Sequence, residues 1–150
     1  MDSLSNEAIL VVEDSKADYI KIERSFKKAN FTDPLIHIEH GDDALDYLLR
    51  SGSYANDPKW VSPAIVLLDI NLPGADGIQI LQKTRATDSI RQIPIIMMTT
   101  SSDPKDVEQC YLAGANSYIV KPFSNQDFYA TMEKIRNYWM SLVTLPPSHS

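Results

Sequence analysis

The sequence AIVLLDI at residues 64–70 decides the fold, because it is an almost unbroken apolar run that ends beside a carboxylate, Asp69. A continuous apolar run of this length is typical of a strand buried on both faces, as in a parallel sheet covered by helices. The carboxyl ends of such strands form the edge where open α/β sheets bind their ligands. The run therefore predicts a central strand with a polar site at its end.

Four further strands are predicted from short runs on either side. Three are continuously apolar, namely 8–12 (AILVV), 93–99 (IPIIMMT) and 117–120 (SYIV). The fourth, 34–39 (PLIHIE), interrupts its apolar residues with polar ones, which favours a strand at the edge of the sheet.

Amphipathic helices are predicted after each strand. Asp103 and Pro104 mark the start of one helix, Ser124 marks another, and Ser15 with Asp18 has the pattern of a capping box. Strict alternation of strand and helix predicts an α/β protein with a flavodoxin-like (βα)5 fold, a doubly wound parallel five-stranded sheet in the order 2-1-3-4-5. The apolar helix positions, spaced three and four apart, are Tyr19, Ile22, Phe26, Ala44, Leu45, Leu48, Leu49, Ile78, Leu81, Val107, Cys110, Tyr111, Phe128, Met132, Ile135, Trp139 and Leu142.

Size and composition restrict the kind of protein. A chain of 150 residues with 43% hydrophobic residues is expected to form one domain, residues 1–150, without a separate output domain. The net charge of -6 disfavours nucleic acid and anionic membranes as direct partners. The sequence shows no spanning run and no signal peptide in residues 1–7, so we expect a cytoplasmic protein. The single cysteine, Cys110, is expected to pack in the core.

Five polar residues are predicted to meet at the carboxyl edge of the sheet. Glu13 and Asp14 follow the first strand, Asp69 ends the third, Thr99 ends the fourth and Lys121 follows the fifth. Three carboxylates in one crevice repel one another unless a cation neutralises them. Oxygen ligands suit Mg²⁺, with Mn²⁺ as a substitute. We expect Asp69 to be a nucleophile, Lys121 to neutralise developing charge and Thr99 to bind the phosphoryl product.

These motifs resemble the receiver domains of two-component response regulators over residues 7–139, which leaves 140–150 as a C-terminal extension. The segments that carry the resemblance are VVEDS at 11–15, LLDINLPGADG at 67–77, IPIIMMTTS at 93–101 and GANSYIVKPF at 114–123.

The resemblance implies the roles of several residues. It implies that Asp69 accepts a phosphoryl group from a histidine kinase, and that Asp14, Asp69 and the Asn71 backbone carbonyl bind the metal while Glu13 acts through water. It further implies a switch in which Thr99 moves towards the phosphoryl group and Tyr118 turns inward behind it. A cis peptide bond before Pro122 is also implied.

Finer features resemble the single-domain receivers that are paired with bacterial, cyanobacterial-type phytochrome histidine kinases. The connection at 51–63 is longer than in a minimal receiver, and the chain closes with YWMSLVTLPP at 138–147. This tail has more apolar surface than the packing of one helix against the domain would bury. We therefore expect the tail and the exposed face of the last helix to form the interface of a homodimer. The residues expected at that interface are Tyr138, Trp139, Leu142, Val143 and Leu145. Thr100 departs from the family pattern, which usually has Ala or Gly there, and adds bulk beside Asp69.

Other functions fit the sequence less well. An aspartate-based phosphatase or phosphotransferase acting on external substrates typically has a second Asp two residues after its nucleophile, where this chain has Asn71. A flavin or nucleotide binder would need a Gly/Ser/Thr-rich phosphate loop where the chain reads EDSKAD at 13–18. A degenerate receiver is disfavoured by the complete acidic pocket. His37 and His40 are expected to be surface or structural residues. The leading hypothesis is a phosphorylation-controlled switch that promotes only its own aspartyl phosphorylation and dephosphorylation.

Overall fold

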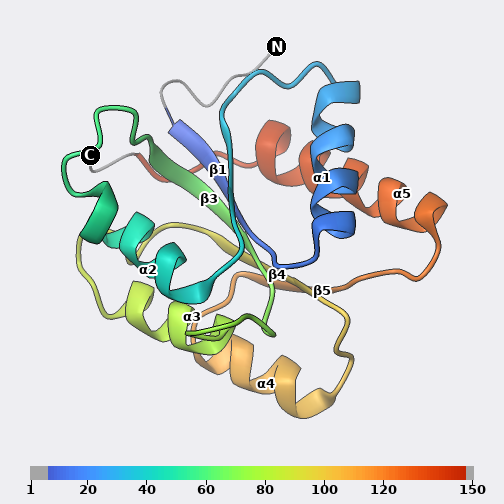
Figure 1. Cartoon of the computed structure of the whole chain (residues 1–150). Helices are drawn as coiled ribbons and strands as arrows, with labels where there is room; N and C mark the ends of the chain where they lie inside the picture. The colour runs from blue at the N-terminus through green and yellow to red at the C-terminus, as the bar shows by residue number, and fades with distance from the viewer. Residues whose placement is uncertain (1–6, 148–150) are drawn as a thin grey trace.

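A computed structural model describes residues 7–147 and confirms the predicted flavodoxin-like fold (Figure 1). Five parallel strands lie in the order β2-β1-β3-β4-β5. The strands are β1 (Glu7–Val12), β2 (Leu35–Ile38), β3 (Ser62–Leu68), β4 (Ile95–Thr99) and β5 (Ser117–Val120). The helices are α1 (Lys16–Lys28), α2 (Gly41–Leu49), α3 (Gly77–Arg85), α4 (Pro104–Leu112) and α5 (Asn125–Ile135), with a 3-10 turn η1 (Gly52–Tyr54) and a π-helical segment η2 (Arg136–Leu142).

Two apolar cores cover the two faces of the sheet, which explains why its central strands are continuously apolar. On one face, the strands pack against α2, α3 and Cys110 of α4, which is fully buried as predicted. On the other face, α1 and α5 supply Ile22, Phe26 and Phe128. β2 is at the edge of the sheet, as its interrupted pattern predicted. Within the described residues, no helix is both long and apolar enough to cross a membrane.

The predicted helix starts are confirmed at Asp103 and Ser124, whose side chains accept hydrogen bonds from the first turns of α4 and α5. The predicted capping box of α1 is only half formed. Ser15 Oγ accepts from the Asp18 N–H at 3.2 Å, but the Ser15 N–H donates to Glu13 Oε2 at 3.0 Å. The Asp18 carboxylate therefore makes its contacts elsewhere.

The end of the chain packs more closely on the domain than the sequence suggested. At Arg136 the last helix changes to the π-helical segment η2, after which the Val143 N–H donates to Tyr138 O at 2.8 Å. Met140 is buried against α1 and α5, and Trp139 and Leu145 pack on the same core. The expected surplus of apolar surface is therefore smaller than predicted. Of the predicted extension 140–150, residues 148–150 lie outside the described part.

The loop between β3 and α3 rests on the start of α2. The Gly41 N–H donates to Pro73 O at 2.9 Å, and the Ala75 N–H donates to Asp42 Oδ1 at 3.2 Å. A Cβ atom on Gly41 would lie 1.6 Å from Ala75 O, so only glycine fits this approach. Because the loop contains Asn71, this contact also sets where the chain runs beside the end of β3.

The substitution Gly41→Ala is expected to lower the free energy of unfolding by about 2 kcal/mol or more, because the loop must move away from the new methyl group. Urea denaturation measures the loss. The matched control is Asp43→Ala, an exposed position in the same helical turn, where we expect a change within about 0.5 kcal/mol. Equal stability of the two variants would contradict the tight approach.

Candidate functional site: an acidic pocket at the carboxyl edge

Backbone hydrogen bonds bring the predicted site residues together where β1, β3 and β5 end. The Glu13 N–H donates to Ile38 O at 3.0 Å, and the Asp69 N–H donates to Val12 O at 3.1 Å. The Lys121 N–H donates to Thr99 O at 2.7 Å. These bonds continue the ladders just beyond the strands, so the backbone at Glu13, Asp69 and Lys121 is fixed relative to the sheet.

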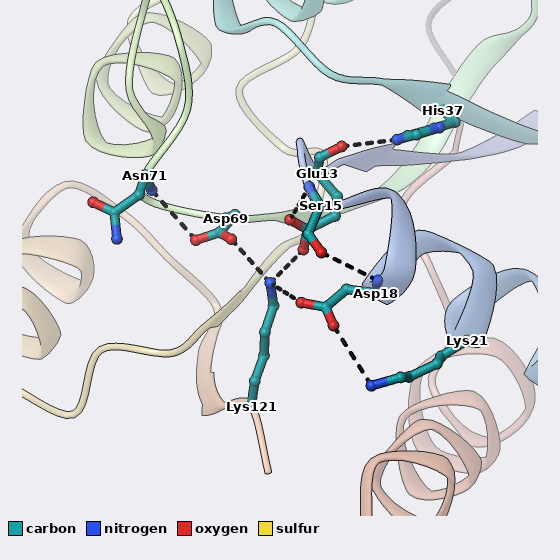
Figure 2. A network of polar contacts seen from close by, with 8 residues as sticks. All are labelled: Glu13, Ser15, Asp18, Lys21, His37, Asp69, Asn71 and Lys121. Atoms are coloured by element: carbon teal, nitrogen blue, oxygen red, sulfur yellow. Dashed lines mark hydrogen bonds and ion pairs between the residues drawn. The ribbon is translucent and has the colours of Figure 1, made fainter. Parts of the chain in front are cut away.

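Lys121 lies at the centre of the pocket (Figure 2). Its ammonium donates to Glu13 Oε1 at 2.5 Å, Asp18 Oδ2 at 2.9 Å and Asp69 Oδ2 at 3.0 Å. The Lys121 side chain is only 4% exposed. An ammonium has three N–H donors, so each has a carboxylate acceptor and the buried charge is fully paired.

Burial and charge act in opposite directions on the ionisable groups of the pocket. Loss of hydration raises the pKa of Glu13 to about 7, although the hydrogen bond and charge of Lys121 act to lower it. Burial alone would lower the pKa of Lys121, but its hydrogen bonds to Glu13 and Asp18 and the nearby charges together raise it. The ammonium therefore stays charged beside Asp69.

The carboxylates of Glu13, Asp14 and Asp69 offer oxygen atoms that all lie within 4.8 Å of one another. Glu13 and Asp69 are buried and Asp14 is exposed, so the cluster opens to solvent on one side. Asn71 adjoins it, and its N–H donates to Asp69 Oδ1 at 3.3 Å. A compact set of hard oxygen atoms fits a divalent cation.

Thr99 and Tyr118 lie on the neighbouring strands β4 and β5, and Thr99 O accepts from the Lys121 N–H. Thr99 is fully buried, and its Oγ1 has no hydrogen-bond partner among the described residues. Buried hydroxyls are rarely left unpaired, so this one is suited to a group that enters the pocket. The Tyr118 hydroxyl donates to Ser101 O at 2.8 Å, which ties β5 to the loop after β4. Thr100 is exposed at the start of that loop.

The structure corrects one expectation and adds one residue. None of the peptide bonds in residues 7–147 is cis, so the predicted cis bond before Pro122 is wrong, and Lys121 reaches its three carboxylates with a trans bond. Asp18 was missed because the sequence accounted for it as a helix cap. Its position in the first turn of α1, a helix that begins at the pocket, was the sequence signal that could have identified it as a pocket residue.

The two histidines have the structural roles that were expected. His37 Nε2 lies 2.8 Å from Glu13 O, and its ring stacks on Tyr19 with the ring centres 3.7 Å apart. The side chain of His40 caps α2 by accepting from the Asp42 N–H.

Comparison with known proteins agrees with this geometry. The family model of the response regulator receiver domain matches residues 9–133. The response regulator Rcp1 of Synechocystis is 34% identical over 138 residues, covering 92% of each chain. The probable methanogenesis regulatory protein FilR2 of Methanothrix harundinacea is 37% identical, over 88% of this chain and 83% of that protein.

Solved structures give the same result. The phosphorylated cyanobacterial phytochrome response regulator RcpA superimposes with a TM-score of 0.88 and 29% identity, over 95% of this chain and all 100% of the other. The Mn²⁺-bound form of Rcp1 gives a TM-score of 0.87 and 33% identity, over 94% of this chain and 99% of the other. With the family model, they show that the chain belongs to the response regulator receiver family and has a phosphoacceptor role in two-component signalling.

Proposed function

We propose that Asp69 is the phosphoacceptor and that Mg²⁺ is the metal of the pocket. The observation that carries this assignment is the difference between the two buried carboxylates. Glu13 uses both oxygens, Oε1 on Lys121 and Oε2 on the Ser15 N–H. Asp69 places Oδ2 on Lys121 but has only a 3.3 Å bond from the Asn71 N–H at Oδ1. Asp69 therefore has the less engaged oxygen, which leaves it the freer of the two carboxylates to bond to phosphorus.

The reaction assigned to this pocket is phosphoryl transfer from a histidine kinase. An Asp69 oxygen forms a bond to phosphorus as the P–N bond of the kinase phosphohistidine breaks, and the imidazole leaves with a proton from solvent. Lys121 holds a positive charge beside the transferred group, and the Thr99 hydroxyl donates to one of its oxygens. A Mg²⁺ ion held by Asp14, Asp69 and the Asn71 carbonyl, with Glu13 acting through water, would neutralise further negative charge.

This chemistry makes the domain a switch and not a catalyst for external substrates. The groups around Asp69 promote its own phosphorylation and the later hydrolysis of the aspartyl phosphate. An aspartate phosphatase is disfavoured because Asn71, whose neutral amide cannot act as a general acid or base, occupies the position of the second Asp.

The phosphoacceptor is tested by incubating the protein with MgCl₂ and acetyl phosphate and measuring the phosphorylated fraction by mass spectrometry. Wild type is expected to gain one phosphoryl group, and Asp69→Asn to lose at least about 100-fold in rate because the nucleophile is gone. Excess EDTA is expected to abolish labelling of the wild type. Asp103→Asn, which changes a helix cap outside the pocket, is the matched control. Equal labelling of Asp69→Asn would refute the assignment.

The role of Thr99 is tested by Thr99→Val, which keeps the shape of the side chain. Because Oγ1 has no partner among the described residues, this change is expected to leave the free energy of unfolding unchanged or raise it by up to about 1 kcal/mol. The same variant is expected to lose the shift of Tyr118 NMR signals that beryllofluoride and Mg²⁺ induce in wild type. A full Tyr118 response in Thr99→Val would show that the hydroxyl is not the link.

We also propose that the kinase is of the phytochrome type and that the protein forms a homodimer. Similarity to Rcp1 and RcpA supports the kinase. Exposed apolar side chains on η2 support the dimer, since Tyr138 is 53% and Leu142 is 73% exposed. Trp139, Val143 and Leu145 are partly buried and complete the proposed interface around these two residues.

The dimer is tested by the double substitution Tyr138→Ser and Leu142→Ser, followed by sedimentation velocity. Loss of both apolar side chains is expected to convert the dimer to monomer. Point substitutions are preferable to truncation, because removing η2 would also remove Met140 from the core. Leu112→Ser, at a 79% exposed position on α4, is the matched control. A dimer that persists in the double variant, or a monomeric wild type, would contradict the interface.

A further inference from the structure

Asp18 contributes a third carboxylate to Lys121 from a different element than the other two. Glu13 and Asp69 directly follow strands, whereas Asp18 lies in the first turn of α1 (Figure 2). Its Oδ2 accepts from Lys121 Nζ at 2.9 Å, a normal length for a charge-assisted hydrogen bond. The Asp18 side chain is 20% exposed and lies at the border of the pocket, whereas the Lys121 side chain is only 4% exposed.

Asp18 differs from the other two acceptors of Lys121 because it has no proposed part in binding the metal or the phosphoryl group. Glu13 and Asp69 belong to the group of carboxylates that fits a divalent cation, and Asp18 does not. In the proposed reaction, one oxygen of Asp69 bonds to phosphorus and the other is left for the metal. Asp18 is then the one acceptor of Lys121 that neither the metal nor the phosphoryl group claims.

Neighbouring residues hold the Asp18 carboxylate in place. The Asp18 N–H donates to Ser15 Oγ at 3.2 Å, which anchors this turn of α1. Lys21 Nζ lies 3.8 Å from Asp18 Oδ1, the oxygen that does not face Lys121. The same ammonium lies 4.9 Å from the ring centre of the buried Phe128 on α5. Asp18 is therefore supported from both α1 and α5.

We infer that Asp18 is a positioning residue for phosphoryl transfer, which fixes the ammonium of Lys121 beside Asp69 while the other carboxylates of the pocket are engaged. This inference rests on the proposed function of Asp69. Lysine has a flexible four-carbon side chain, and its charge stabilises a transferred group only when the ammonium is held at the reacting atoms. Asp18 supplies that constraint, so it acts through Lys121 and does not contact the phosphoryl group.

A double-mutant cycle tests the inference, with the rate of phosphorylation by acetyl phosphate and Mg²⁺ as the readout. Asp18→Ala is expected to slow the wild-type reaction about tenfold, because Lys121 is less well positioned. In a Lys121→Met background, the same substitution is expected to change the rate less than about twofold. Asp18→Glu, which restores an acceptor, is expected to recover the rate to within about threefold of wild type.

The matched control is Glu23→Ala, which removes one carboxylate from the same helix outside the pocket and should change the rate less than about twofold. Thermal melts check that every variant is folded. An Asp18→Ala rate equal to wild type overturns the inference, and so does an equal loss in both backgrounds, since Asp18 would then act without Lys121. A wild type that takes no phosphoryl group refutes the proposed function as well, whereas a labelled wild type with a fast Asp18→Ala variant refutes only this inference.

Discussion

The buried ammonium of Lys121 is the interaction on which the carboxyl edge of the sheet depends. Three carboxylates, from the ends of β1 and β3 and the first turn of α1, converge on this one cation. A charge out of water is tolerated only when it is paired and hydrogen-bonded, and removing one partner leaves the others uncompensated. The arrangement therefore links three parts of the chain that are far apart in sequence, namely residues 13–18, Asp69 and Lys121.

The pocket nevertheless keeps an excess of negative charge, and this excess suits it to its reaction. Four carboxyl groups, those of Glu13, Asp14, Asp18 and Asp69, lie around the one buried ammonium of Lys121. Burial raises the pKa of Glu13, and the nearby charge of Asp69 adds to this effect. The proposed divalent cation would reduce this excess of negative charge, and the proposed phosphorylation of Asp69 would change it again.

The apolar cores make this balance possible by holding the strand ends in register. β1 and β3 are central strands with helices packed on both sides, so their carboxyl ends cannot shift without disturbing both cores. The polar groups at the edge are preorganised by this packing. At the opposite end of α5, the change to a π-helical segment turns Met140 into the core and leaves Tyr138 and Leu142 exposed. The last helical segment therefore contributes one side chain to the core and exposes two others to solvent.

The sequence by itself determined the fold and the gathering of five polar residues at the carboxyl edge of the sheet. These residues are Glu13, Asp14, Asp69, Thr99 and Lys121. Continuous apolar runs mark buried parallel strands, and residues that follow such strands must meet at one edge, so local pattern was sufficient there. Only the tertiary structure decided the contact of Asp18 with Lys121, the bond before Pro122 and the packing of Trp139 and Leu145. Local signals were ambiguous at these positions, because a capping pattern, an X-Pro bond and an apolar tail each permit more than one arrangement. Asp18 contacts Lys121 across 103 residues of sequence, and no local pattern contains a partner that only the folded chain brings near.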